Sequence, residues 1–400
     1  MSLIYLSKPP NSEFNRYLFE KLCLPLEDAQ CFFGWGAGGR GINIELVSSH
    51  PLANPFKFIE QNIKKPLTIL WFLDYLVPVA KNVEEFLLKN IDKKFIFVTS
   101  MGNFKLNAPN CIVVEGPHDL THQWLSYPSV PAMLDKNFDS DKIFISLSRN
   151  KRMHRVALVM LLLGMNMEKY GTISFLSTKG DVLNHLDKEG GNQWFERLDH
   201  SGHLKPQMIS EIIEHGQSKF IDHKFDTLDN WDSVYSRIAV LKKENATGND
   251  NVGNYLYNLI SLYKNSFVEI INETSGYEGS AAIVSEKTLN SIYGCNFPIF
   301  NNNPLMPNMM KNLGLDIFED IVNHDYQYET NMYSRVWKLI EMNKELLTNA
   351  DRTKELWLRN KHRFERNVEF ARKELYEVYE NRTENQFKDA LKRLNTSYAS

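Results

Sequence analysis

Short apolar runs alternate with amphipathic stretches over the first third of the chain. Four of these runs have the length and composition of buried strands: residues 29–35, 67–72, 95–99 and 111–115. Between the second and third run, residues 83–91 carry apolar side chains at helical spacing. Strands that alternate with helices in this way predict a parallel sheet with crossover helices.

The same alternation returns after residue 140. The predicted strands here are residues 142–147, 171–175, 267–271 and 297–300. An apolar helix is predicted over 156–163, a two-turn helix over 287–293 with Ser285 as its N-cap and Gly294 at its end, and a short helix over 309–313. Residues 180–250 are polar and irregular, and we interpret them as an insertion with helices. From residue 332 onward the pattern is strongly helical, and residues 350–394 predict amphipathic helices with a solvated face.

The length of the chain and a proline-marked stretch predict a division into two domains. Its 400 residues exceed one typical core, so two domains are expected. A polar, proline-marked stretch near residues 116–131 suits a boundary. We therefore predict an α/β protein with Rossmann-like domains at 1–135 and 136–335. Helices at 336–400 would form a C-terminal extension that crosses back to the first domain.

Composition excludes several classes of protein. A net charge of −3 disfavours a broad nucleic-acid-binding surface. The four cysteines have no metal-site or disulfide-framework spacing, which is typical of reduced cytoplasmic thiols. His118 and His122 lie four residues apart without a clear third ligand, so no metal site is predicted. The start of the chain lacks a signal-peptide pattern, and residues 156–165 are too short to span a bilayer, so we expect no transmembrane segment.

A basic turn follows the predicted strand at 142–147. Four cations occur between Ser148 and Val156, and the carboxyl ends of parallel strands and helix N-termini are where phosphates bind. Arg149 and Lys151, nearest the strand end, are the best phosphate candidates. Arg155 lies on the entering helix, where it has either a phosphate-binding or a structural role. The alternative is that the whole turn is an exposed basic loop.

A second group follows the strand at 267–271. Glu273 comes just after the strand, and Ser285, Glu286 and Lys287 open the predicted helix. An acid and a lysine at the positive end of a helix can hold a ribose diol and a phosphate. The alternative is a capped surface helix with an acid in its first turn.

Other candidate residues lie in the first domain. Five glycines occur between residues 34 and 41, and we single out Gly36, Gly38, Gly39 and Arg40 as a loop for phosphate or acceptor. The stretch has no lysine of a Walker loop and matches G-x-G-x-x-G only weakly, so a simple loop is an equal alternative. Asp74, His118 and Asp119 follow predicted strands and are candidate general bases, although a structural role is more common for such residues.

Several motifs together resemble a family. Ser285-Glu286-Lys287-Thr288, Phe297-Pro298-Ile299, Leu313 to Phe318 and Asn323-His324-Asp325-Tyr326-Gln327 resemble motifs in glycosyltransferases of bacteria, phages and large viruses. The segment from Leu147 to Val156 is similar to their basic loop, and Glu273-Thr274 to a further motif. The Ser-Glu-Lys element is also similar to that of fucosyltransferases and exostosin-like enzymes. The resemblance covers residues 143 to about 335.

This resemblance implies a fold and a set of contacts. The fold is GT-B, with two Rossmann-like domains facing a cleft, and catalysis there does not require a metal ion or cofactor. Glu286 would contact the ribose, Lys287 and Arg149 the diphosphate, and Tyr326 would be retained from the donor site. Asn323 and Gln327 replace family aspartates, and Leu315 replaces a phenylalanine, which puts the aspartate contacts of that loop in doubt.

The expected activity is sugar transfer from a nucleotide-diphosphate sugar to an acceptor hydroxyl, in the cytoplasm, or in the host cytoplasm if the protein is viral. The acceptor would be a carbohydrate or, less favoured by the negative net charge, a hydroxylated DNA base. Inversion and retention both stay open. The alternatives are a non-catalytic nucleotide- or glycan-binding assembly protein and a phosphate-binding regulatory module.

Overall fold

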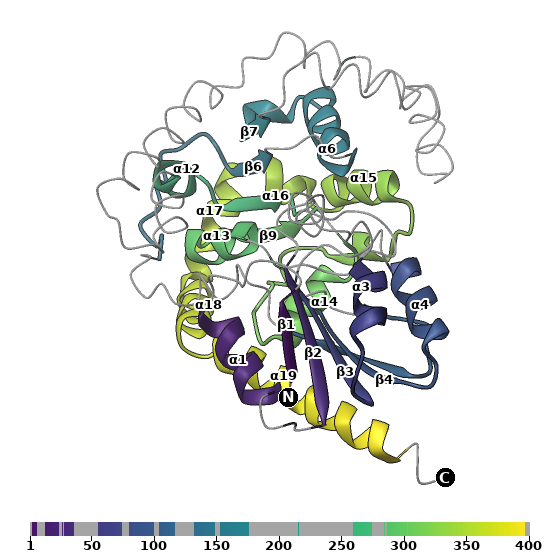
Figure 1. Cartoon of the computed structure of the whole chain (residues 1–400). Helices are drawn as coiled ribbons and strands as arrows, with labels where there is room; N and C mark the ends of the chain where they lie inside the picture. The colour runs from purple at the N-terminus through teal and green to yellow at the C-terminus, as the bar shows by residue number, and fades with distance from the viewer. Residues whose placement is uncertain are drawn as a thin grey trace, which may run out of the picture. The chain divides into compact units, whose positions relative to one another are not determined.

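A computed structural model describes most of the chain in two parts (Figure 1). The described residues are 2–5, 13–23, 26, 28–35, 55–73, 80–99, 104–116, 132–148, 153–175, 215, 259–273, 284, 286–301 and 303–396. Unit 1 contains Met1–Ser126, Ser280–Ile283 and Lys373–Ser400, and unit 2 contains Tyr127–Gly279 and Val284–Arg372. The predicted domains change at residues 135 and 335, whereas the compact units change at residues 126 and 372.

Unit 1 is built on a five-stranded parallel sheet. Its strands are β1 (Ser2–Tyr5), β2 (Ala29–Trp35), β3 (Leu67–Leu73), β4 (Lys94–Thr99) and β5 (Cys111–Glu115). They lie in the order β1-β2-β3-β4-β5, so consecutive strands are neighbours. The four strands predicted from apolar runs are confirmed, and β1 is an addition.

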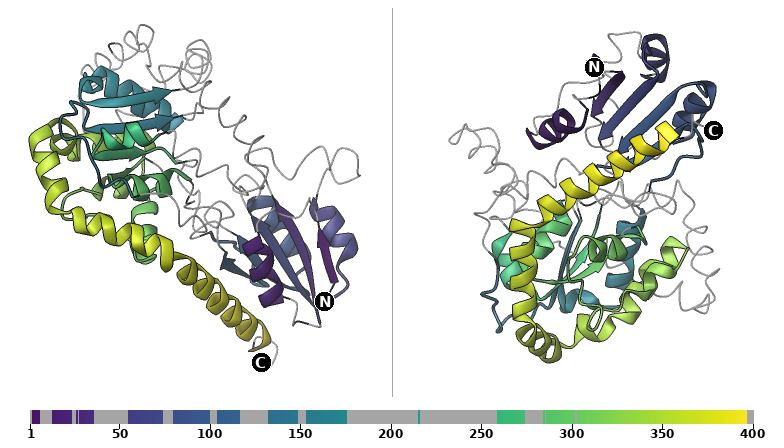
Figure 2. Two further views of the ribbon diagram at one scale, coloured as in Figure 1. Left: turned by 90° about the vertical axis from the view of Figure 1, so that its left-hand side faces the viewer. Right: turned by 90° about the horizontal axis from the view of Figure 1, so that it is seen from below.

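Helices cover both faces of this sheet. On one face, α1 (Glu13–Cys23) and α19 (Leu375–Thr396) share an apolar core with the strands, which includes Leu18, Trp71 and Phe387. On the other face, α3 (Pro55–Asn62) and α4 (Ala80–Lys89) pack through Ile59 and Phe86. Figure 2 shows the long helix α19, in yellow, beside this sheet. The last helix of the chain therefore completes the core of the first sheet.

The free edge of β5 is covered by side chains from α19. The Glu115 N–H donates to Gln386 Oε1 at 2.8 Å, and Thr383 Oγ1 donates to the Glu115 carbonyl at 2.9 Å. Arg382 Nη2 bonds the Glu115 carboxylate at 2.8 Å. Because an edge strand leaves backbone groups unpaired, these contacts protect the end of β5, the last strand in the order of this sheet among the described residues.

Unit 2 contains a four-stranded parallel sheet. Its strands are β6 (Phe144–Ser148), β7 (Gly171–Phe175), β8 (Val268–Ile271) and β9 (Phe297–Phe300), in the order β7-β6-β8-β9. All four match predicted strands. The chain moves from β6 to β7 on one side and then returns to add β8 on the other side, so the strand order reverses between β6 and β8.

Short helices connect and flank these strands. They are α6 (Met153–Gly164), η2 (Met167–Lys169), α12 (Ile260–Lys264), α13 (Glu286–Gly294), α14 (Met306–Asn312), η3 (Asp325–Tyr328) and α15 (Met332–Met342). Helix α6 packs against α15 and is buried along most of its length, which explains why its sequence is apolar all round.

Three further helices end unit 2: α16 (Lys344–Thr348), α17 (Ala350–Arg359) and α18 (Lys361–Lys373). Trp357 of α17 is buried and donates its indole N–H to the Cys295 carbonyl at 2.7 Å. Its ring lies 6.0 Å from that of Phe267 and 5.6 Å from that of Phe364. Within the described ranges, no helix is long and apolar enough to cross a membrane.

Candidate functional site

The reversal of strand order in unit 2 marks the candidate site. In an open parallel sheet, a ligand binds beyond the carboxyl ends of the two strands between which the order reverses. These strands are β6 and β8, which end at Ser148 and Ile271. Helices α6 and α13 follow them along the chain, and their positive N-termini therefore lie toward the same sheet edge.

A buried polar network joins the strand ends at this edge. Asn272 Nδ2 donates to Ser146 Oγ at 2.9 Å, and Asn301 Nδ2 donates to Asn272 Oδ1 at 2.7 Å and to the His154 carbonyl at 3.2 Å. Buried polar groups are costly unless they are hydrogen-bonded, so this network fixes β6, β8, β9 and α6 relative to one another. The Ser148 hydroxyl is also buried, and it has no hydrogen-bond partner among the described residues.

Two basic side chains of α6, His154 and Arg155, bind the backbone that follows β8. His154 Nε2 lies 3.0 Å from the Glu273 carbonyl, and a carbonyl only accepts, so this nitrogen carries the proton. Arg155 Nη2 donates to the carbonyls of Asn272 at 3.0 Å and Glu273 at 2.8 Å. Arg155 is 2% exposed. Its guanidinium thus binds backbone carbonyls. Of the two roles that the sequence allows for Arg155, phosphate binding and structural, this contact is of the structural kind.

The Glu273 side chain reaches helix α13. Thr288 Oγ1 donates to Glu273 Oε1 at 2.6 Å, and both residues are buried. Thr288 lies in the first turn of α13, directly after Lys287, which is half-buried. Glu286 is the first residue of the same helix. Glu286 and Lys287 therefore lie in the first turn of α13, the same turn that the buried Glu273 side chain reaches through Thr288.

Tyr326 lies in a second buried chain of hydrogen bonds. Its hydroxyl accepts from the Phe300 N–H at 2.9 Å and donates to His324 Nδ1 at 3.3 Å, while His324 Nε2 donates to the Ile317 carbonyl at 2.9 Å. Burial lowers the pKa of His324, so the neutral ring suits this arrangement. Tyr326 is 1% exposed. Through this contact Tyr326 supports the end of β9 from a buried position.

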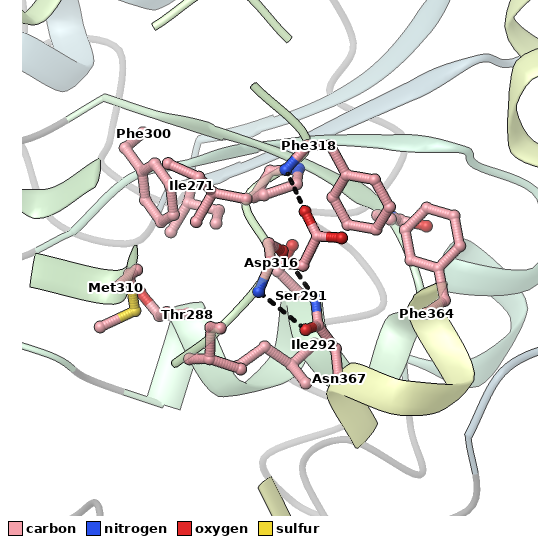
Figure 3. A pocket seen from close by; sticks show the side chains of 14 residues that line it. Ile271, Thr288, Ser291, Ile292, Phe300, Met310, Asp316, Phe318, Phe364 and Asn367 are labelled. Atoms are coloured by element: carbon pink, nitrogen blue, oxygen red, sulfur yellow. Dashed lines mark hydrogen bonds between the residues drawn. The ribbon is translucent and has the colours of Figure 1, made fainter. Parts of the chain in front are cut away.

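A small cavity lies beneath α13 (Figure 3). Thr288, Ser291 and Phe318 are among its lining residues, and its volume is about 20 Å³. Asp316 and Asn367 form one wall and are joined by two hydrogen bonds. The Asp316 N–H donates to Asn367 Oδ1 at 2.9 Å, and Asn367 Nδ2 donates to the Asp316 carbonyl at 2.7 Å. Such a volume holds about one water molecule, so this cavity cannot be the pocket for a nucleotide or a sugar.

The opposite end of α13 is held by a buried lysine. Lys136 Nζ donates to the carbonyls of Tyr263 at 2.7 Å and Gly294 at 2.6 Å, and to Asn296 Oδ1 at 2.5 Å. These carbonyls belong to the last residues of α12 and α13, where the helix dipole favours a cation. Burial lowers the pKa of Lys136 to about 7.

Glu269 of β8 is a buried acid in the same region. It is 3% exposed, and Tyr263 OH donates to its Oε1 at 3.0 Å. Burial raises the pKa of Glu269 to about 8, because the charged form loses its hydration. The protonated carboxyl is therefore favoured near neutral pH.

The remaining predicted residues fall outside the described residues. They are Gly36, Gly38, Gly39, Arg40, Asp74, His118, Asp119, Arg149, Lys151 and Ser285. Sequence reasoning also missed members of the buried network, namely Ser146, Asn272 and Asn301. The available signal was a polar residue inside or directly after an apolar strand run.

Comparison of the chain with known proteins finds no relative. No known protein family matches the chain, and no curated protein or solved structure is similar to it. In the part of the chain that the structure describes, no group of three His, Cys, Asp or Glu side chains is arranged to hold a metal ion. The case for a function therefore depends on the sequence motifs and on the geometry of unit 2.

Proposed function

We propose that the protein is a glycosyltransferase of the GT-B type that uses a nucleotide-diphosphate sugar as donor. The observation that supports this most is the reversal of strand order between β6 and β8, with the N-termini of α6 and α13 toward one edge. This is where α/β sheets bind nucleotides. The Ser148 hydroxyl, buried at the end of β6, adds a polar group at that point.

In this proposal unit 2 binds the donor. Glu286 accepts hydrogen bonds from the ribose hydroxyls, and Lys287, Arg149 and Lys151 bind the diphosphate. The leaving diphosphate gains negative charge as the sugar bond breaks, so cations and a helix N-terminus placed beside it stabilise the transition state. These protein groups would supply the positive charge without a metal ion or another cofactor.

Unit 1 would carry the acceptor hydroxyl. Asp74, His118 and Asp119 are the candidate bases, and the loop with Gly36, Gly38, Gly39 and Arg40 would contact acceptor or phosphate. A base that removes the proton directly gives inversion at the sugar carbon. We propose that the acceptor is a carbohydrate and that the protein acts in the cytoplasm. If it comes from a phage or another virus, this is the cytoplasm of the host. A hydroxylated DNA base is the less favoured acceptor.

Thermal unfolding with a panel of UDP-, GDP-, CMP- and dTDP-sugars tests the proposal. A donor present at one hundred times its Kd stabilises the folded state by about 2.7 kcal/mol, which gives a measurable rise in Tm. We expect one donor class to raise the Tm of the wild type and to have little effect on Glu286→Ala and Lys287→Ala. Lys311→Ala is the matched control, because Lys311 is an exposed lysine of unit 2 paired with Glu319.

The outcomes separate the alternatives. Absence of any shift at millimolar nucleotide sugar would contradict the proposal. A shift with nucleotide but no transfer or hydrolysis of the sugar would favour a non-catalytic nucleotide-binding protein. A shift with oligosaccharides alone would favour a glycan-binding protein.

A further inference from the structure

Strand β8 and helix α13 face each other through two acids and two hydroxyls. Glu269 lies in β8, and Glu273 lies two residues after the end of that strand. Thr288 and Ser291 are three residues apart on α13 and share a face of that helix. Thr288 Oγ1 donates to Glu273 Oε1 at 2.6 Å, whereas the buried Ser291 hydroxyl has no hydrogen-bond partner among the described residues.

Glu273 differs from Glu269 because it also contacts helix α6. Its carbonyl accepts from His154 Nε2 at 3.0 Å and from Arg155 Nη2 at 2.8 Å, while its carboxylate accepts from Thr288. One residue therefore connects the first turn of α6 to the first turn of α13. Glu273 and its partners His154, Arg155 and Thr288 are each at most 2% exposed.

We infer that Glu273 and Thr288 are positioning residues that fix the first turn of α13 relative to α6. This inference rests on the proposed function for its consequence, because those two helix ends would hold the donor. A carboxylate that is buried and bonded to Thr288 orients Glu286 and Lys287 through the helix and does not itself touch the ligand. The assignment replaces the direct donor contact predicted for Glu273.

The first experiment needs no ligand. Amide hydrogen exchange of the full chain is compared in wild type, Thr288→Val, Thr288→Ser and Ser291→Ala. We expect Thr288→Val to speed exchange of the Leu289 and Asn290 amides, the first in α13 with an intrahelical acceptor, by about tenfold, since a buried hydrogen bond is lost. Thr288→Ser retains the hydroxyl and should restore slow exchange. Ser291→Ala removes a hydroxyl one turn farther along the same face and should leave these amides unchanged.

The second experiment measures the affinity of UDP and GDP for the same variants and for Glu273→Gln. The glutamine oxygen still accepts from Thr288, so a positioning role predicts a Kd within about threefold of wild type for Glu273→Gln and for Thr288→Ser. It predicts a loss of about tenfold or more for Thr288→Val. Equal exchange in Thr288→Val and wild type, or failure of Thr288→Ser to restore it, would overturn the inference.

Two further results have distinct meanings. If Glu273→Gln loses nucleotide binding while Thr288→Val keeps it, Glu273 contacts the ligand directly and the positioning role is wrong. If neither nucleotide nor any sugar donor binds the wild type, the proposed function fails, whereas the exchange experiment still decides whether the pair fixes α13.

Discussion

The two sheets differ in strand order and in what their interiors contain. In unit 1 consecutive strands are neighbours, and apolar clusters cover both faces of the sheet, with Gln30, Thr68 and Thr99 as buried polar side chains of its strands. In unit 2 the order reverses between β6 and β8, and Ser146, Asn272 and Asn301 are buried and hydrogen-bonded beyond that point. Buried polar groups cost free energy unless they are paired. The hydrogen-bonded network at the reversal therefore distinguishes the strand ends of unit 2 from the apolar clusters of unit 1.

The comparison predicts that unit 1 is most sensitive to loss of apolar contacts. Phe387 of α19 is 1% exposed and packs in the core shared by α1 and the sheet. Phe387→Ala should reduce the stability of unit 1 by about 3–5 kcal/mol, because it removes a large buried side chain and leaves a cavity. Hydrogen exchange of β4 amides, compared with β8 amides, measures the effect in each unit.

Lys388→Ala is the control for this variant. Lys388 neighbours Phe387, but its side chain is 66% exposed in a pair with Glu384. Its replacement should change the exchange of β4 little. Equal destabilisation of β4 and β8 by Phe387→Ala would show that α19 does not belong energetically to unit 1 alone.

Much of this architecture is predictable from the sequence. Among the described residues, eight of the nine strands coincide with apolar runs bounded by polar or turn residues, because buried parallel strands need such runs. Strand β1 was missed, since four residues at the start of a chain give too short a pattern. The predictions also lack helices α1 and α3, whose amphipathic stretches are only 11 and 8 residues long.

The site was less predictable, for a physical reason. Glu273, Glu286 and Lys287 stood out because charged residues follow a strand, but sequence cannot separate an exposed charge from a buried one. Arg155 and Tyr326 have the residue types of a ligand site and are nevertheless buried against backbone groups. The acceptors of Lys136 lie 127 to 160 positions away, beyond the reach of any local pattern.

Lys136 offers the corresponding test in unit 2. Lys136→Met keeps the length of the side chain and removes its three donors, which leaves the oxygens of Tyr263, Gly294 and Asn296 buried without this partner. We expect a loss of about 2–4 kcal/mol in the stability of unit 2. Exchange of β8 and β9 amides should accelerate, whereas β4 should be unaffected.

Lys264→Met controls for loss of a positive charge close by. Lys264 is 42% exposed and pairs with Asp135, which is 91% exposed. Such a pair contributes little, so this variant should unfold like wild type. If Lys136→Met were as stable as wild type, buried polarity would not be an energetic requirement of unit 2, and the contrast with unit 1 would lose its basis.

The smallest expected effect concerns the pH dependence of unit 2. The folded protein holds the Glu269 proton up to a pKa of about 8, whereas an unfolded glutamate has a pKa of about 4.5. This contribution to stability is therefore complete below pH 4.5 and is lost as the pH rises toward 8. Between pH 5 and 6.5 the stability of wild type should fall relative to Glu269→Gln by about 1 kcal/mol per pH unit.

The chosen window separates Glu269 from its neighbour. Burial lowers the pKa of Lys136 to about 7, so its contribution has the opposite sign and develops above that pH, where unfolded lysine is still protonated. Urea unfolding of unit 2 at several pH values measures the difference, and Glu355→Gln, an exposed helix position, is the control. Parallel pH profiles for wild type and Glu269→Gln would mean that Glu269 is ionised in the folded state. Unit 2 would then hold a buried charged carboxylate that accepts from the Tyr263 hydroxyl, in place of a neutral acid.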